Sequence, residues 1–225
     1  MHSKRYRAAR ALVETGKTYP LAEAIGLLKQ TASTKFDGSV EIHIRLGVDP
    51  TKGDQSVRGT VELPHGSGKK VRVAVIAKGP AAKAAKDAGA DIVGDEDLIA
   101  EIKKKESIAA DVVIATPDMM KLLAPVAKIL GTKGLMPNPK NETVTADPGK
   151  AVLAWQKGKV PFRSDNTANV HAIVGKPSFT PEQLQENISM FIDAVKKVKP
   201  TTTKGTYMKS ITLAASMGPG IKVSL

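Results

Sequence analysis

The stretch Pro64-His65-Gly66-Ser67-Gly68-Lys69-Lys70 separates two kinds of strand pattern and thereby decides the fold. Before it, residues 39–48 alternate apolar and polar side chains, which predicts a half-buried strand with one polar face. After it, residues 71–77 are almost continuously apolar, which is typical of a strand buried on both faces. We interpret residues 64–70 as a hinge-like linker between two domains.

The chain downstream of this linker predicts a small doubly wound α/β domain over residues 68–158. Apolar strands without alternation are separated by helical segments, and this order is typical of a parallel sheet covered on both faces. The crossovers are expected to be right-handed. Strands are predicted at 71–77, 91–93 and 111–115, and helices at 80–88, 96–105, 117–130 and 148–156.

The two ends of the chain predict a second domain, made of residues 1–67 plus 159–225. A strand at 57–63 follows the one at 39–48 closely, so we expect these two to pair antiparallel. A helix at 181–198 is preceded by Thr180, with Gln183 placed for a capping box. Further helices are predicted at 4–15 and 20–31, and a further strand at 206–215. Strands at 160–163 and 169–174, joined by residues 164–168, are predicted to form a hairpin. The fold class is therefore α+β with two domains: a discontinuous, split βαβ-like antiparallel-sheet domain with an inserted Rossmann-like α/β domain.

Charge is distributed unevenly along the chain. The net charge is +12, and residues 71–158 contribute only +2 of it, with 13 basic and 11 acidic side chains. Residues 195–225 contain six lysines and no acidic residue. The excess at the two ends predicts a polyanionic partner.

Other bulk features narrow the class of protein. The chain contains no cysteine, which excludes disulfides and thiolate metal sites. No apolar stretch follows the basic start, and no run approaches the ~18 apolar residues of a membrane span. We expect a soluble, cytoplasmic protein without a membrane association.

No catalytic, cofactor or metal motif is found. Residues 66–70 resemble the end of a phosphate-binding P-loop, but Leu63 and Lys70 occupy positions where that motif needs Gly and Ser or Thr. The first βα turn of the middle domain, Ala77-Lys78-Gly79-Pro80, lacks a dinucleotide-binding fingerprint. Beside a protein that binds a structural polyanion through its two basic ends, two alternatives stay open: a nucleotide-dependent enzyme that uses the middle domain, and a free-standing DNA-binding repressor.

The segment Gly131–Lys140 is rich in glycine, proline and lysine, and three interpretations of it compete. Its backbone N–H groups could bind a phosphate, with help from Lys133 and Lys140. It follows a predicted helix C-terminus, however, and the negative end of the helix dipole disfavours an anion there. A structural role, with Gly131 just beyond the helix end, is the second interpretation.

The third interpretation is a family signature, because residues 129–140, Ile-Leu-Gly-Thr-Lys-Gly-Leu-Met-Pro-Asn-Pro-Lys, resemble the ribosomal protein L-one family. The resemblance extends in family order over nearly the whole chain. It includes Lys35-Phe36-Asp37, Val57-Arg58-Gly59-Thr60-Val61, Leu63-Pro64-His65-Gly66, Asn169-Val170-His171, Gly175-Lys176 and Ser216-Met217-Gly218-Pro219.

The resemblance implies a non-enzymatic structural protein of the large ribosomal subunit, which acts as a monomer within the ribosome. It implies binding to large-subunit rRNA in the mobile stalk, contact with exit-site tRNA, and repression of translation through its own operon mRNA. The RNA-binding residues that we expect from it are Lys35, Phe36, Arg45, Arg163, Asp165, His171, Lys176, Thr212, Ser216, Met217 and Gly218.

Three positions depart from the family pattern. Ser216 stands where Thr is expected, which keeps a hydroxyl available to RNA. Ala168 stands where Gly is common, so the turn at 164–168 is expected to differ. Asn141-Glu142 stand before Thr143 where Gly is usual, which affects a backbone conformation of the middle domain.

Overall fold

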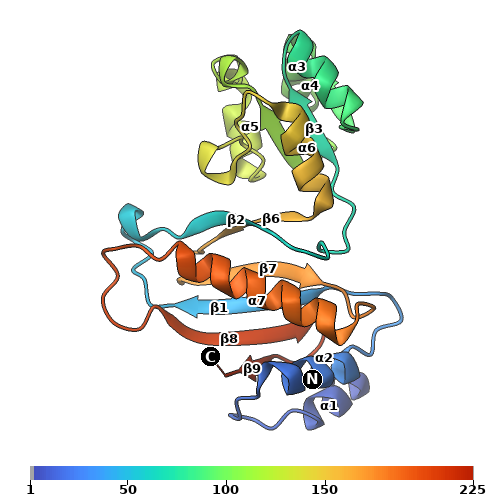
Figure 1. The fold of residues 1–225 in the computed structure, drawn as a ribbon, viewed down its shortest axis with the longest axis vertical. Helices are drawn as coiled ribbons and strands as arrows, with labels where there is room; N and C mark the ends of the chain where they lie inside the picture. The colour runs from blue at the N-terminus through green and yellow to red at the C-terminus, as the bar shows by residue number, and fades with distance from the viewer. Residues whose placement is uncertain (1–2, 225) are drawn as a thin grey trace. The chain divides into compact units, whose positions relative to one another are not determined.

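The computed structural model describes residues 3–224, and the chain divides into two compact units (Figure 1). The first unit comprises Met1–Gly68 and Val160–Leu225, and the second comprises Lys69–Lys159. The first contains an antiparallel sheet and the second a separate parallel sheet, which confirms the predicted mixed α+β class. Within the described residues, no helix is both long and apolar enough to cross a membrane.

The first unit is built on a four-stranded sheet with the order β7-β1-β8-β9. The strands are β1 (Val40–Leu46), β7 (Asn169–Gly175), β8 (Met208–Ala215) and β9 (Ile221–Val223). Strand β1 pairs antiparallel with both β7 and β8, and β9 pairs antiparallel with β8. Alternation in β1 buries Val40, Ile42, Ile44 and Leu46 on one face, as the sequence predicts.

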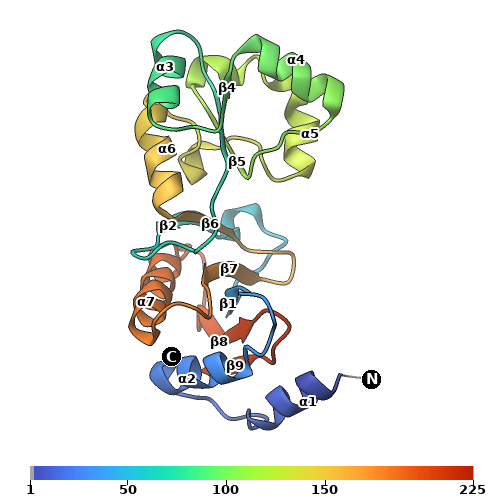
Figure 2. The ribbon, with the colours of Figure 1, turned by 90° about the vertical axis from the view of Figure 1, so that its right-hand side faces the viewer.

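Two helices cover one face of this sheet. Helix α2 (Leu21–Thr31) packs against β8 and β9, and helix α7 (Pro181–Lys197) packs against β7. Figure 2 shows both helices on the same side of the strands. The short helix α1 (Lys4–Ala11) packs against α2. The opposite face of the sheet therefore presents the polar residues of the alternating pattern.

Helix α7 begins with the predicted capping box. The Thr180 hydroxyl accepts a hydrogen bond from the Gln183 N–H at 3.3 Å, and the Gln183 side chain accepts one from the Thr180 N–H at 3.0 Å. The apolar stripe of the helix buries Leu184, Ile188 and Phe191 completely. Phe191 meets Phe162 edge to face, with ring centroids 5.5 Å apart. These contacts fix α7 across the sheet.

Two predicted strand pairings are wrong. Strand β2 (Arg58–Glu62) pairs with β6 (Lys159–Arg163) in a separate two-stranded sheet, and not with β1. Both edges of β1 are occupied by β7 and β8, so no edge remains for β2. Strands β6 and β7 likewise belong to different sheets, and only an isolated bridge between Ser164 and Val170 joins their ends. The segment 163–171 therefore reverses through the predicted turn, which this bridge closes, but the two strands then diverge into different sheets instead of pairing as a hairpin.

The second unit is a three-stranded parallel sheet with the order β4-β3-β5. Its strands are β3 (Val73–Ile76), β4 (Ile92–Gly94) and β5 (Val112–Ala115). Its helices are α3 (Pro80–Asp87), α4 (Glu96–Lys105), α5 (Ala127–Thr132) and α6 (Pro148–Lys157), with short 3-10 turns at Gly53–Gln55 in the first unit and at Pro117–Met120, Ala124–Val126 and Pro139–Asn141 in the second. Alternate residues of β3 enter two different hydrophobic clusters, so the sheet is covered on both faces as predicted.

The predicted long helix over residues 117–130 is wrong. The segment is broken into two 3-10 turns and the short helix α5. Pro125 lies in the middle of it, and a proline cannot donate the backbone hydrogen bond that a continuous helix needs. Gly131, predicted to lie just beyond the helix end, lies inside α5. The glycine that follows the end of the helix in the left-handed conformation is Gly134, with φ +70°.

Candidate nucleic-acid interface

The uncovered face of the four-stranded sheet, which we call the open face, presents a cluster of polar and charged side chains. Strand alternation places every second residue there, and the buried partners point to the helices. The register sets His43 beside both His171 and Thr212, and Thr212 beside Lys222. The members of the open face are Glu41, His43, Arg45, Asn169, His171, Ser210, Thr212 and Lys222.

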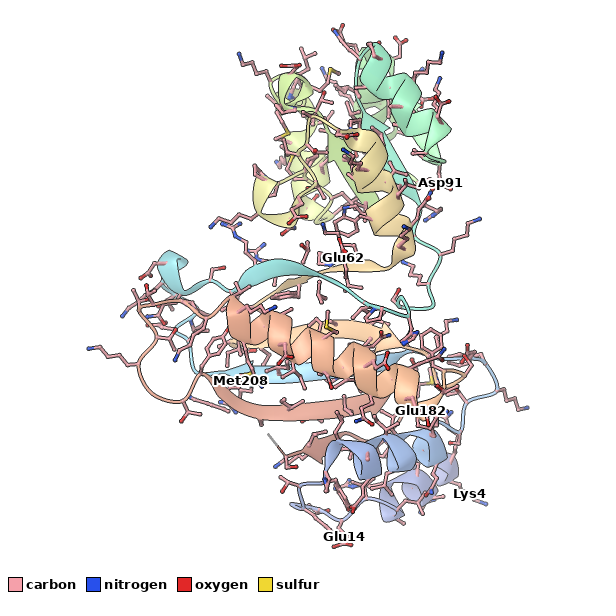
Figure 3. All side chains as sticks on the ribbon, viewed as in Figure 1. Lys4, Glu14, Glu62, Asp91, Glu182 and Met208 are labelled. Atoms are coloured by element: carbon pink, nitrogen blue, oxygen red, sulfur yellow. The ribbon has the colours of Figure 1, made fainter. Side chains whose placement is uncertain are left out.

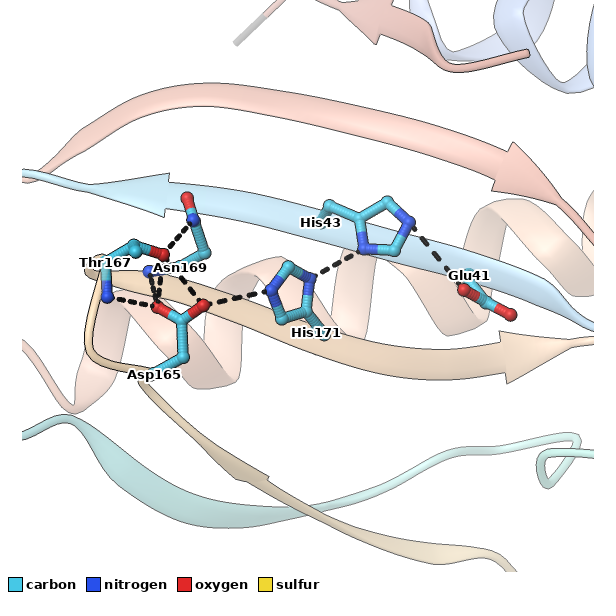
Figure 4. A network of polar contacts seen from close by, with 6 residues as sticks. All are labelled: Glu41, His43, Asp165, Thr167, Asn169 and His171. Carbon is cyan, nitrogen blue, oxygen red and sulfur yellow. Dashed lines mark hydrogen bonds and ion pairs between the residues drawn. The ribbon is translucent and has the colours of Figure 1, made fainter. Parts of the chain in front are cut away.

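A chain of polar contacts crosses the open face between β1 and β7 (Figure 4). The Nδ1 atoms of His43 and His171 lie 2.8 Å apart, so one ring donates a proton and the other accepts it. Beyond them, His171 Nε2 lies 3.4 Å from Asp165 Oδ2, and His43 Nε2 lies 3.8 Å from Glu41 Oε2. The two carboxylates therefore stand at the two ends of the histidine pair.

Electrostatics hold this network in a defined protonation state. Partial burial, followed by the nearby charge of His171, lowers the pKa of His43 below 6.5, and Glu41 opposes the shift. The backbone N–H of Asn169 is the main cause that lowers the pKa of Asp165 to about 2. Asp165 is thus ionised and His43 is neutral around neutral pH.

Asp165 also organises the turn between β6 and β7. Its Oδ1 accepts hydrogen bonds from the N–H groups of Thr167 and Asn169, each at 2.8 Å. Ala168 closes the turn with φ +62°, and its carbonyl accepts the Leu46 N–H at 2.8 Å, which ties the turn to the end of β1. The carboxylate oxygens are used within the protein, so Asp165 shapes the open face and positions His171.

A second group of predicted residues gathers where β1 begins and β8 ends, and we call it the Met217 end. Val40 is paired with both Ala215 and Gly175, which brings three chain segments together there. The Met217 end comprises residues 35–39, Lys176 and residues 216–218.

Ser216 is a structural residue of the Met217 end. Its Oγ accepts the Ser39 N–H at 2.8 Å, and its own N–H donates to the Ser39 carbonyl at 2.9 Å. A Cβ atom on Gly38 would lie 2.8 Å from the Ser216 Cβ, so glycine is required at position 38. The hydroxyl is already engaged, and the expectation that it is free for RNA needs correction: only a remaining lone pair can face a ligand.

Met217 is held outward by a strained turn. The Gly218 N–H donates to the Ala215 carbonyl at 2.8 Å, and Met217, at the third position of this turn, has φ +58°. Glycine is favoured at such a position, and strain of this kind is typical of functional sites. The Met217 side chain is 69% exposed and that of Phe36 is 55% exposed. Phe36 is therefore a surface residue and does not belong to the core.

Two lysines flank these apolar side chains. Lys35 is exposed and directly precedes Phe36. Lys176 lies 3.5 Å from the Asp37 carboxylate, which also accepts a hydrogen bond from the Ser178 hydroxyl at 3.0 Å. The Met217 end thus combines exposed apolar surface with positive charge, and flat apolar contacts suit bases while ammonium groups suit phosphates.

The structure brings most of the predicted residues into these two groups and leaves one out. Arg45, His171 and Thr212 lie on the open face, with Asp165 at its border. Arg163 ends β6 in the other sheet, and among residues 3–224 no hydrogen bond or ion pair joins its side chain to either group. Its assignment came with the hairpin interpretation of 163–171, which the separate sheets contradict.

Sequence reasoning missed five members of the open face: Glu41, His43, Asn169, Ser210 and Lys222. The signal was present, since each lies next to a buried apolar residue in its strand. What was missing was the pairing of β1 with β7 and β9 with β8, because these partners are far apart in the sequence. Alternation gives the face of a strand, and only pairing gives the neighbours on that face.

Comparison with known proteins gives consistent matches. The family model of the "Ribosomal protein L1p/L10e family" matches residues 28–219. The chain is 52% identical over 223 residues to the "Large ribosomal subunit protein uL1" of Thermosipho melanesiensis, covering 99% of this chain and 96% of that protein. It is 54% identical over 221 residues to the protein of the same description from Corynebacterium aurimucosum, covering 98% and 94%. The Mycoplasma capricolum protein of that description is 52% identical over 221 residues, covering 98% and 97%.

Proposed function

Because this chain belongs to the ribosomal protein L1p/L10e family and is a protein of the large ribosomal subunit, we propose that it binds large-subunit rRNA directly. The rRNA contacts the open face and the Met217 end of the first unit. Arg45 neutralises a phosphate, and the Thr212 hydroxyl meets a ribose 2′-OH. Phe36 and Met217 provide flat contacts to bases.

The observation that carries this proposal is the joint display of Phe36 and Met217 beside a polar face. Both are large apolar side chains exposed at one end of the sheet, and Met217 is held there at positive φ. An exposed apolar pair that needs strain to be displayed is typical of a binding surface. The positive charge excess of the two chain ends lies in the same unit.

The proposed role in the ribosome is structural and non-enzymatic. The protein forms the mobile stalk with its rRNA, and through the stalk it contacts tRNA at the exit site. The same surface binds the operon mRNA that encodes the protein, and this binding represses translation. If one surface binds both RNAs, a stalk rRNA fragment should displace the mRNA leader from the protein completely in a competition binding assay.

The direct test is the affinity of a stalk rRNA fragment for a triple variant, Lys35→Ala, Phe36→Ala and Met217→Ala. The lost stacking contact of Phe36 alone is worth about 1–3 kcal/mol, so we expect the dissociation constant to rise at least about tenfold. Ser216 is left intact because its bonds to Ser39 support the fold.

The matched control is Leu153→Ala, Met190→Ala and Lys197→Ala, which removes two other exposed apolar side chains and one exposed lysine. Its affinity should stay close to that of the unchanged protein. Equal affinities for the two triple variants would contradict the proposed surface.

Two rival functions predict different results. A DNA-binding repressor would be displaced from rRNA by duplex DNA as effectively as by unlabelled rRNA. A nucleotide-dependent enzyme would bind ATP or NAD through the second unit, where Gly79 at φ +59° begins α3 and Lys78 is paired with Glu96. Saturable nucleotide binding abolished by changes at this turn would favour the enzyme.

A further inference from the structure

A cavity of about 420 Å³ lies between α1, the segment that follows it, and β9. Arg10 comes from the end of α1, Lys17 from the following segment, and Lys222 from β9, with Tyr6 on another wall. In Figure 3, Lys4 and Glu14 mark the beginning of α1 and the segment after it. The volume is within the ~300–1,000 Å³ of pockets that hold small molecules.

The charged residues that line the cavity leave an excess of positive charge after Lys17 and Glu14 have paired with each other. Glu14 is its acidic lining residue, and the Lys17 ammonium lies 2.9 Å from the Glu14 carboxylate. Among residues 3–224, no ion pair is found for Arg10 or Lys222. Two cations from different elements of the fold therefore remain for an anionic ligand. A guanidinium and an ammonium group together are suited to phosphate.

The walls are held in place by a buried tyrosine. Tyr19 is 4% exposed, and its hydroxyl accepts the Glu14 N–H at 3.0 Å. Its backbone donates to the Lys222 carbonyl and accepts from the Ser224 N–H, each at 2.9 Å. The segment after α1 is thus fixed to β9, and the cavity is formed before any ligand binds, which lowers the entropy cost of binding.

The cavity adjoins the proposed interface. Its lining residues Pro219 and Gly220 directly follow the Ser216–Gly218 turn. A Cβ atom on Gly220 would lie 2.9 Å from the Thr212 Cγ2, so this wall touches the open face. Lys222 belongs both to the open face and to the cavity, since it pairs with Thr212 in the sheet.

We propose that this cavity binds one nucleotide unit of the RNA held by the open face, with its phosphate between Arg10 and Lys222. Tyr6 forms the wall against the sugar or base. The inference rests on the proposed RNA-binding function and extends the interface beyond the sheet to the basic N-terminal helix.

The first experiment measures the affinity of a stalk rRNA fragment for Arg10→Ala with Lys222→Ala in the full chain. Loss of charge-assisted hydrogen bonds to one phosphate is expected to weaken binding about tenfold or more. The slope of log affinity against log salt should fall by about 0.7–0.9.

The matched control is Arg5→Ala with Arg7→Ala, which removes the same charge from exposed positions of α1 that do not line the cavity. This control should bind RNA much more tightly than the Arg10 and Lys222 variant. Equal affinities and equal salt slopes for the two double variants overturn the inference while the proposed function stands. Thermal melting of both variants verifies that each is folded.

A second experiment does not depend on RNA binding. Adenosine 5′-monophosphate is titrated into the protein while amide NMR shifts of Gly16 and Gly220 are followed. Saturable shifts that persist in Met217→Ala and vanish in the Arg10 and Lys222 variant are expected. Absence of shifts in the unchanged protein, or equal competition by a polyglutamate peptide, overturns the nucleotide assignment, whether or not the rRNA binds.

Discussion

At the scale of single residues, two of the three positions that depart from the family pattern share an unusual backbone conformation. Ala168 and Glu142, where glycine is usual, have φ +62° and +53°. The departures could be recognised from the sequence, but their cause could not, because the sign of φ depends on how the turn meets its neighbours. Glu142 also gains an ion pair with the nearly buried Lys159.

Ala168→Gly is predicted to leave the stability of the protein nearly unchanged. Relief of the left-handed conformation stabilises by roughly 1–2 kcal/mol, whereas the larger unfolded-state entropy of glycine costs about 0.5–1 kcal/mol and loss of the buried methyl group about 0.8 kcal/mol. Ala172→Gly in regular strand β7 is the control, because it has the costs without the relief, and it should lower the free energy of unfolding by about 0.5–1 kcal/mol in urea denaturation. Equal destabilisation by the two changes would refute the explanation.

The histidine pair predicts a dependence of stability on pH. Because the pKa of His43 is lowered below 6.5, the unfolded chain binds more protons than the folded one just below that value. Stability contributed by neutral His43 is therefore present above about pH 6.5 and is lost as the pH falls through the folded pKa. Asp165, with a pKa of about 2, adds a loss only at much lower pH.

The measurement compares unfolding free energies of the unchanged protein and His43→Gln at about pH 7 and about pH 5. The unchanged protein should lose more stability over this interval than the variant. An NMR titration of His43 with a midpoint above 6.5, or an equal loss in the two proteins, would contradict the network described here.

At the scale of elements, local signals in the sequence are reliable and pairings between distant segments are not. The alternation of β1, the apolar run of β3 and the capping box of α7 depend on neighbouring residues, and the structure confirms them. The pairing of β2 with β6 joins segments about a hundred residues apart, and nothing local specifies it. This is also why the open face was only partly predicted.

Thr180→Ala is predicted to remove the capping box of α7. Loss of an N-cap hydroxyl costs about 1 kcal/mol, with a range of about 0.5–2 kcal/mol. Because α7 covers the sheet opposite the open face, the cost should appear in the global unfolding free energy. Thr201→Ala, an exposed threonine outside any helix or strand, is the control and should change stability little. Equal effects would contradict the role of the cap.

At the scale of the whole molecule, the larger part of the excess positive charge lies in the first of the two units. Residues 71–158 carry a net charge of only +2 out of +12, and they form most of the unit without a predicted RNA site. The lysine-rich turn at 130–140 lies in that unit, and Lys133 donates to the Glu106 carbonyl at 3.0 Å. The segment that best marks the family is therefore not where we place the principal RNA contacts.

The most direct test of RNA binding by the first unit is an experimental structure of the full chain with a stalk rRNA fragment. Our account predicts RNA against Arg45 and Thr212 on the open face, with Phe36 and Met217 buried by it. An RNA bound mainly by residues 69–159, with Phe36 and Met217 still exposed to solvent, would contradict the account.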